Sequence, residues 1–210
     1  MCCRYFTQPS GDLAPMIEAA KRAAYAEKLI KELGVQIVTE GEVYPTNTVP
    51  VIAPGKDRKE SVFLMKWGFS SERSKAPTVN ARVESAADKP TFRESFAKRR
   101  CVIPASYYFE WEHYTDPRTG KSRTGDKYMI RPAGKTRTML AGIYRIEEIK
   151  GVRAPVFAIL TQEPGEGIRF IHDRMPVIIP EDAVSDWIDP DGDPFKVLER
   201  VIKDVEYRKA

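Results

Sequence analysis

Short runs of β-branched and aromatic residues, interrupted by proline, glycine and polar turns, set the strongest limit on how this chain folds. Nine such runs are predicted as strands: residues 35–38, 44–52, 61–67, 101–104, 107–111, 128–131, 138–144, 156–160 and 177–179. Helical segments fall between them at irregular intervals, which is typical of the α+β class rather than of a regular βαβ repeat. So many short strands favour a strongly bent, barrel-like mixed β core flanked by helices.

The main predicted helix spans residues 16–33, with Pro15 at its first position and Gly34 closing it. A shorter helix over 91–99 is predicted to turn Phe92 and Phe96 inward. The remaining helical turns are predicted at 166–170, 181–188 and 194–202. Three connections complete the pattern. Because of its prolines, the segment 44–52 is predicted to be an edge strand or a loop. Residues 70–76 are predicted as a polar loop, and residues 113–127 as a long basic hairpin connection.

The chain of 210 residues, 42% hydrophobic and 30% charged, is long enough to bury a core without staples, so we expect one domain over residues 1–210. The apolar runs are too short to span a membrane, and the start lacks a signal-peptide pattern, so a cytoplasmic protein without a membrane partner is expected. Three cysteines and two histidines argue against a disulfide framework and a zinc site, and neither metal nor cofactor is expected. The net charge of +4 permits nucleic-acid binding without requiring it.

Cys2 is the residue with the most unusual chemistry. Removal of Met1 leaves a free amine beside the Cys2 thiol, and such a 1,2-aminothiol condenses with an aldehyde to an imine that the thiol then closes to a thiazolidine. The alternative is a small buried residue at the end of an edge strand.

Asn80, Glu110 and His172 are polar residues in apolar settings. The alternation of a strand over 107–111 places Tyr108 and Glu110 on one face and the other three aromatic residues on the opposite face. A carboxyl among aromatic residues tends to have a raised pKa, which suits an acid/base near neutrality. Taken singly, each residue also has a structural explanation: a turn, a partner for an arginine, and a hydrogen-bonded core histidine.

Longer motifs give these residues a context. They are Met1-Cys2 with Arg4, Tyr44-Pro45-Thr46, Pro50-Val51-Ile52, Trp67-Gly68, Asn80-Ala81-Arg82 with Glu84, Arg100-Cys101-Val102-Ile103-Pro104-Ala105, Phe109-Glu110-Trp111 and His172-Asp173-Arg174-Met175-Pro176-Val177. With them, nearly the whole chain resembles the SOS response-associated peptidase (SRAP) family, abasic-site proteins that crosslink to single-stranded DNA.

The resemblance implies that Cys2 forms the crosslink and that Asn80, Glu110 and His172 complete the catalytic site. It also implies that Arg4, Arg82, Trp67 and Pro45 contact DNA, the arginines by pairing with phosphates and Trp67 by offering an apolar surface to a base. For Trp67, an ordinary core position is an equal alternative. The expected partner is single-stranded DNA containing abasic sites, and the expected state is a monomer.

The chain departs from the family pattern at three places. Cys3 stands where the family usually has glycine, Tyr107 replaces another glycine, and residues 141–145 read Ala-Gly-Ile-Tyr-Arg instead of Ala-Gly-Leu-Trp-Glu. These changes bear on pocket shape and DNA contacts more than on the chemistry. Two other functions stay open from the sequence: an N-terminal-nucleophile hydrolase using Cys2, and a non-covalent module for single-stranded DNA. Whether the protein removes Met1 itself also stays open.

Overall fold

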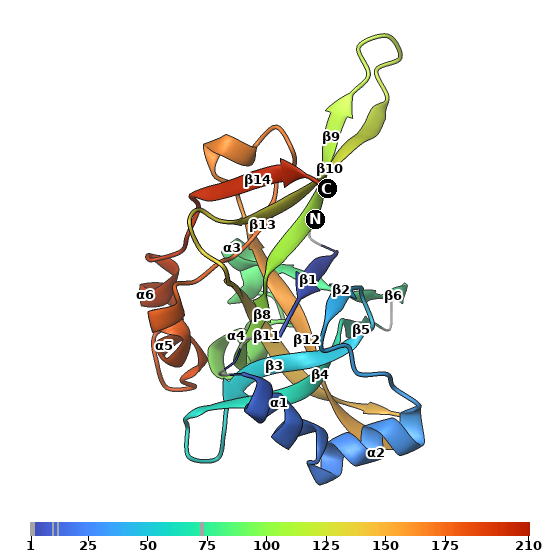
Figure 1. The fold of residues 1–210 in the computed structure, drawn as a ribbon, viewed down its shortest axis with the longest axis vertical. Coiled ribbons are helices and arrows are strands. Elements are labelled where there is room, and N and C mark those ends of the chain that lie inside the picture. Colours follow the sequence, from blue (N-terminus) through green and yellow to red (C-terminus); the bar gives the residue numbers. More distant parts are fainter. Residues whose placement is uncertain (1–2, 10, 12, 72–73) are drawn as a thin grey trace.

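Five strands close a ring at the centre of the molecule: β11 (Thr138–Ile149), β8 (Arg100–Ala105), β3 (Thr48–Pro54), β4 (Glu60–Trp67) and β12 (Val152–Gln162). The ring closes because β11 pairs with both β8 and β12. The β4–β12 pairing is parallel and the others are antiparallel. The computed structural model describes residues 3–9, 11, 13–71 and 74–210. Its α+β class with a barrel-like mixed core is as the sequence predicts (Figure 1).

A second sheet lies against this ring. It is antiparallel, in the order β14 (Val205–Lys209), β10 (Ser122–Pro132), β9 (Tyr107–Thr115), β1 (Tyr5–Thr7) and β2 (Gly41–Val43). The ends of β9 and β10 project from the body as a long hairpin (Figure 1). The predicted hairpin connection is therefore confirmed, although the paired strands extend into it. The sequence did not predict β14, whose residues are mostly polar and exposed.

The predicted helix over 16–33 is two helices, α1 (Ala14–Lys21) and α2 (Ala24–Leu33). Ala23 is extended between them, with φ −67° and ψ 138°, so the single-helix prediction is wrong. The break lets α1 pack on β4 while α2 packs on β12. No proline or glycine marks this position, so the change of direction is imposed by packing on a curved sheet. Gly34 ends α2 in the left-handed conformation at φ 63°, as predicted.

Four other predictions need correction. The strands predicted at 35–38 and 177–179 are single bridges, Ile37 to Thr48 and Leu140 to Ile178. The loop predicted at 70–76 includes parts of a small hairpin, β5 (Phe69–Ser71) with β6 (Ser74–Thr78). The segment 44–52, predicted as an edge strand or loop, contributes to β3, which is paired on both sides, with β8 and with β4. The pairing with β8 is at Ile52, away from the prolyl nitrogen of Pro50.

The remaining elements are short: β7 (Asn80–Arg82), β13 (Met175–Pro176), α3 (Val83–Ala86), α4 (Arg93–Lys98), α5 (Val184–Ile188), α6 (Pro194–Leu198) and the 3₁₀ turns η1 (Glu166–Ile168) and η2 (Glu181–Ala183). The helices predicted near 91–99, 181–188 and 194–202 are present in shortened form, and Phe92 and Phe96 are buried as expected. None of the described helices combines the length and the hydrophobicity needed to cross a membrane.

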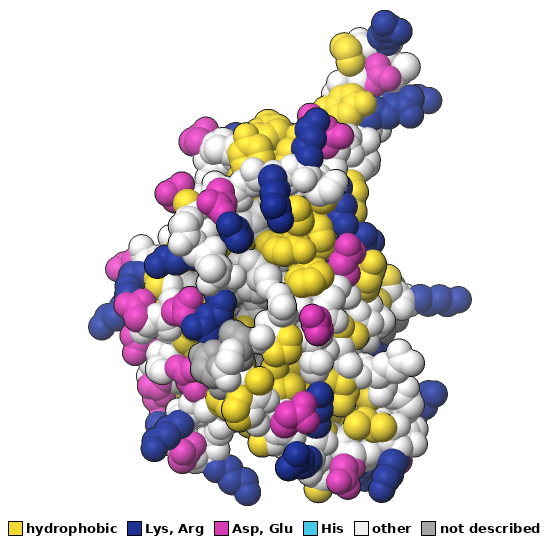
Figure 2. Space-filling view, viewed as in Figure 1, with side chains coloured by type: hydrophobic (Ala, Val, Ile, Leu, Met, Phe, Trp, Pro, Cys, Tyr) yellow, Lys and Arg dark blue, Asp and Glu magenta, His cyan; other side chains and the backbone are white. Residues whose placement is uncertain are grey.

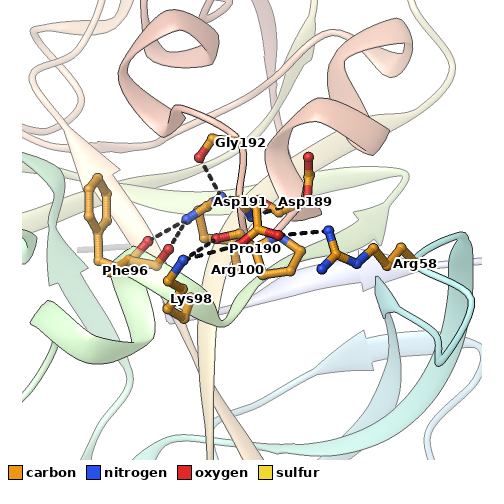
Figure 3. Close-up of polar contacts among 9 residues, drawn as sticks. Arg58, Phe96, Lys98, Arg100, Asp189, Pro190, Asp191 and Gly192 are labelled. Atoms are coloured by element: carbon orange, nitrogen blue, oxygen red, sulfur yellow. Dashed lines mark hydrogen bonds and ion pairs between the residues drawn. The ribbon is translucent and has the colours of Figure 1, made fainter.

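Arg100 fixes the C-terminal helices to the barrel (Figure 3). Its fully buried guanidinium donates to backbone carbonyls of Phe96 at 2.9 Å, Trp187 at 2.7 Å and Gly192 at 3.1 Å, and also to those of Ala97 and Asp189. At the surface beside it, the Asp191 carboxylate accepts from Arg58 at 2.7 Å and Lys98 at 3.2 Å.

Candidate active site

Glu110 lies on the inner face of β9. Tyr108 pairs with Tyr5 and Glu110 pairs with Tyr128, and these two partners and Tyr108 belong to one buried core cluster, so Tyr108 and Glu110 face inward and the predicted alternation is confirmed. Only 3% of Glu110 is exposed, and its Oε1 accepts a hydrogen bond from the Trp111 N–H at 3.2 Å. Burial raises the pKa of the Glu110 carboxyl above its usual 4.5. A carboxyl in this state keeps its proton to higher pH and can act as an acid.

His172 lies in the segment between η1 and β13, beside the end of β9. The backbone N–H of His113 donates to the Ile171 carbonyl at 2.9 Å, which attaches this segment to β9. The side chain of His172 is 12% exposed. Desolvation lowers its pKa from 6.5 to about 4, against the opposing effect of Asp173, so the imidazole is neutral at physiological pH.

Two contacts at Nδ1 decide how the His172 ring can exchange protons. The backbone N–H of Arg174 donates to Nδ1, with the two nitrogen atoms 3.0 Å apart, and Oδ1 of Asp173 lies 2.7 Å from Nδ1. A neutral ring accepts from Arg174 with its proton on Nε2, or donates from Nδ1 to Asp173 and leaves Nε2 as a base. The two arrangements differ by one tautomer shift. His172 can therefore give or take a proton at Nε2.

The structure brings His113 to the same place, which the sequence reasoning did not anticipate. The rings of His113 and His172 lie 4.8 Å apart, edge to face. The donor atoms of Glu110, His113 and His172 all lie within 4.8 Å of one another, the single such group found among the described residues. Imidazole and carboxylate groups are ordinary zinc ligands, so these three are the described residues that could hold a metal ion.

Asn80 begins β7, which pairs in parallel with β12 through Ile159. An ion pair connects β7 and α3 to the His172 segment, since Arg174 donates to both oxygens of Glu84, at 2.9 and 2.8 Å. Arg174 also donates to the Thr161 carbonyl on β12 at 2.7 Å. Asn80 and His172 thus lie on two segments that are both attached to β12. The role of Asn80 in the site stays a prediction.

Cys2 lies outside the described residues. The next residue, Cys3, lies close enough to Glu110 that, after burial, the Glu110 carboxylate is the second cause that raises the pKa of the Cys3 thiol. The Phe109 N–H donates to the Arg4 carbonyl at 2.9 Å, which extends the β1–β9 pairing toward Cys3. The first described residue, Cys3, therefore lies close to Glu110.

The predicted DNA contacts are in different situations. Arg82, at the end of β7, is exposed. Arg4 lies over the rings of Tyr44 and Trp111, with its guanidinium 3.5 Å from Glu42. Pro45 is half-buried in the turn after β2, beside the exposed Tyr44.

Trp67 does not offer a surface to a base, so this expectation is wrong for the structure described. It is fully buried, stacked on Phe157 with ring centroids 6.0 Å apart, and its indole N–H donates to the Val79 carbonyl at 2.9 Å. The alternative of a core aromatic residue is the one observed. A strand rich in apolar residues, such as β4, carries no signal that separates a core tryptophan from a binding one.

Sequence reasoning missed Trp111, His113 and Arg174 as site neighbours. Trp111 and Arg174 stand within motifs quoted above, but only their contacts assign them a place. His113 could have been suggested by its position three residues after Glu110. Strand alternation alone argues against that pairing, and the irregular β9–β10 register between Thr124 and Lys127 lies beside it.

Comparison with known proteins places the chain in a family. The family model described as SOS response associated peptidase (SRAP) matches residues 1–209, and the chain belongs to this family. Among solved structures, a protein from Bacteroides thetaiotaomicron has the same fold, with a TM-score of 0.73 at 20% identity over 99% of this chain and 91% of that one.

Named relatives are more similar in sequence. Abasic site processing protein YobE of Bacillus subtilis is 29% identical over 180 residues, 78% of each chain. Abasic site processing protein YedK of Escherichia coli is 29% identical over 149 residues, 65% of this chain and 63% of its own. Abasic site processing protein HMCES of Rattus norvegicus is 30% identical over 159 residues, which cover 61% of this chain and 45% of the rat protein.

Proposed function

We propose that this protein captures abasic sites in single-stranded DNA by forming a covalent thiazolidine between Cys2 and the ring-opened sugar. The observation that carries the proposal is the pairing of an inward-facing acid, Glu110, with a neutral histidine, His172, close to Cys3, the first described residue. The named relatives, which are abasic site processing proteins, support the choice of substrate.

The first step opens the sugar. An abasic deoxyribose is a cyclic hemiacetal in equilibrium with an open aldehyde. Glu110, which keeps its proton to higher pH because burial raises its pKa, donates that proton to the ring oxygen O4′. His172, neutral because burial lowers its pKa to about 4, takes the proton of the C1′ hydroxyl at Nε2. The products are a C4′ hydroxyl and an aldehyde at C1′.

The second step forms the crosslink. After Met1 is removed, the Cys2 amine adds to C1′. His172 returns its proton to the C1′ oxygen, the Glu110 carboxylate left by the first step carries one amine proton to the same oxygen, and that oxygen leaves as water. Glu110 then takes the remaining amine proton, which restores its acid form and leaves a neutral imine. The resulting imine carbon is attacked by the Cys2 thiol, whose proton passes to the nitrogen, and a five-membered ring closes. The reaction condenses one aldehyde with one aminothiol and releases one water. Asn80 would orient the new N-terminus by hydrogen bonds, a positioning effect worth several kcal/mol.

Removal of Met1 by the protein itself is part of this proposal, and the family's description as a peptidase supports it. Mass spectrometry of the purified Glu110→Gln and His172→Gln variants tests this step. Retention of Met1 in either variant, when the unsubstituted protein has lost it, would assign the cleavage to the site. Complete loss in both would assign it to a cellular aminopeptidase.

The crosslink is tested by incubating the protein with an oligonucleotide that carries one abasic site and running a denaturing gel. A heat-stable adduct is expected for the unsubstituted protein, for Cys3→Ala and for Cys101→Ala, and none for Cys2→Ala. Cys101 is a matched control because it is fully buried and its thiol pKa is raised well above the usual value by burial. Loss of the adduct in Cys3→Ala with normal Met1 removal would mean that the other thiol reacts. The same mixture on a native gel separates the alternatives: a reversible shift without a heat-stable adduct would favour the non-covalent binding module, and the absence of any binding would favour the hydrolase.

A further inference from the structure

One face of the second sheet, which contains β9, carries a row of aromatic side chains. They belong to β1, β9 and the residue after β2: Tyr44, Phe6, Tyr107, Phe109 and Trp111. This is the side of β9 opposite Glu110, and we name it the outer aromatic face. Phe6 and Tyr107 are stacked with centroids 5.0 Å apart and an interplanar angle of 11°, and Phe109 meets Tyr107 edge to face at 5.3 Å.

Basic side chains lie on these rings. The Lys127 ammonium is 3.6 Å from the centre of the Phe109 ring and 5.6 Å from that of Trp111. The Arg4 guanidinium is 4.4 Å from the Tyr44 ring and 4.9 Å from Trp111. Rings alternating with positive charge are the composition of surfaces that bind single-stranded nucleic acids, because bases stack on the rings and phosphates pair with the cations.

The charge on this side is positive and partly masked. Among the described residues that the sheet register places on the face, the cations are Arg4, Lys127, Arg131 and Arg208, and the acids are Glu42 and Glu206. The Glu42 carboxylate lies 3.5 Å from Arg4 and 3.2 Å from Lys127. A phosphate could take the place of this carboxylate between the two cations. Arg208 and Tyr107 line a depression of about 290 Å³ at the edge toward β14.

The face is open. In Figure 1 no helix lies in front of β1, β9 and β10, and in the same view Figure 2 shows hydrophobic side chains gathered over this region between dark-blue basic ones. The face adjoins the candidate site along the chain, because Arg4 follows Cys3 and Trp111 follows Glu110, while its rings lie on the side of β9 opposite Glu110.

We propose that the outer aromatic face binds the single-stranded DNA that flanks a captured abasic site, with Phe6, Tyr107 and Trp111 stacking bases and Lys127 and Arg208 pairing with phosphates. This inference rests on the proposed function. Tyr107 and Trp111 are four residues apart on one strand, or about 13 Å, enough for a few nucleotides. Single-stranded DNA fits better than duplex, whose bases are already stacked on one another.

The experiment compares abasic oligonucleotides with a two-nucleotide flank on each side and with eight added nucleotides on one side or the other. Single-turnover crosslinking at increasing DNA concentration yields the half-saturating concentration for each. We expect the longer flank on one side to tighten capture, and Tyr107→Ala and Lys127→Ala each to weaken capture of the long DNA relative to the short by roughly fivefold or more. Arg208→Ala serves as a third variant, because truncation at this exposed position leaves the core packing intact.

Lys28→Ala is the matched control, since it removes one exposed cation from α2 at the other end of the molecule. It should keep the long-to-short ratio of the unsubstituted protein. If flank length has no effect, or if the outer-face variants keep that ratio, the inference is wrong while the proposed function survives. If no oligonucleotide gives an adduct, the proposed function itself fails. An equal gain from a flank annealed into duplex would also overturn the stacking role.

Discussion

Arg100 and Glu110 are both buried ionisable residues, ten positions apart, and their surroundings differ in kind. The Arg100 guanidinium donates to five backbone carbonyls from α4 and the segment around α5. The Glu110 carboxyl accepts from Trp111 and lies beside two histidines, with burial raising its pKa. A buried charge surrounded by partners serves the fold, whereas a buried acid with a raised pKa beside a neutral base is equipped for proton transfer.

The largest expected effect is on the rate of crosslinking in Glu110→Gln. The amide keeps the shape of the side chain and removes its proton exchange, so crosslinking should slow by about 10² to 10⁴ while folding and DNA binding persist. Single-turnover crosslinking at saturating DNA, with a melting curve, measures both properties. Glu112→Gln, on the same strand, is the matched control and should react normally. A stably folded Glu110→Gln protein with an unchanged rate would remove Glu110 from the mechanism.

Arg100→Met should produce the opposite result, a loss of stability. The side chain keeps its length, but five buried carbonyls lose their donor, and we expect the free energy of unfolding to fall by about 3–5 kcal/mol. Urea denaturation measures the change. Arg58→Met removes an arginine whose pairing with Asp191 is exposed and should cost less than about 1 kcal/mol. Equal losses in the two variants would show that the carbonyl shell around Arg100 contributes little.

The pH dependence of stability separates His172 from Glu110. The folded pKa of His172 is lowered from 6.5 to about 4, so the unfolded chain binds more protons in that range and stability rises with pH across it. The folded pKa of Glu110 is raised above 4.5, so its contribution is present at lower pH and is lost as pH rises through the folded pKa. The two effects oppose each other where their ranges overlap.

Glu110→Gln should therefore make the rise in stability between pH 4.5 and 6.5 steeper, and a further His172→Gln substitution should flatten it. One proton corresponds to a slope of at most about 1.4 kcal/mol per pH unit. Urea denaturation at half-unit pH steps measures each slope. A double variant as acid-sensitive as Glu110→Gln alone would mean that another group titrates in this range.

The sequence predicted the class of fold and most strands, because alternation and turn residues are local signals. The inward direction of Glu110 followed from alternation in this way. The break at Ala23 and the burial of Trp67 depend on how distant strands curve and pack, which no local pattern encodes. For the site, motifs indicated Glu110 and His172 separately. Only the folded chain shows that His113 lies beside His172. His113 is three residues from Glu110, but the direction of its side chain depends on the irregular pairing of β9 with β10, which the sequence does not reveal.

The smallest effect is expected at Arg82, which is exposed, whereas Arg100 is fully buried. A surface arginine that pairs with a phosphate contributes through counterion release, so log K for capture of abasic single strands should fall with log salt concentration, and Arg82→Ala should reduce that slope by roughly 0.7. Its thermal stability should be unchanged, in contrast to Arg100→Met. Affinities measured between about 50 and 200 mM salt provide the slope, with Lys28→Ala as the control that keeps it. Salt-independent capture by the unsubstituted protein would argue against phosphate anchoring altogether, while an unchanged slope in Arg82→Ala alone would move the contact to other basic residues.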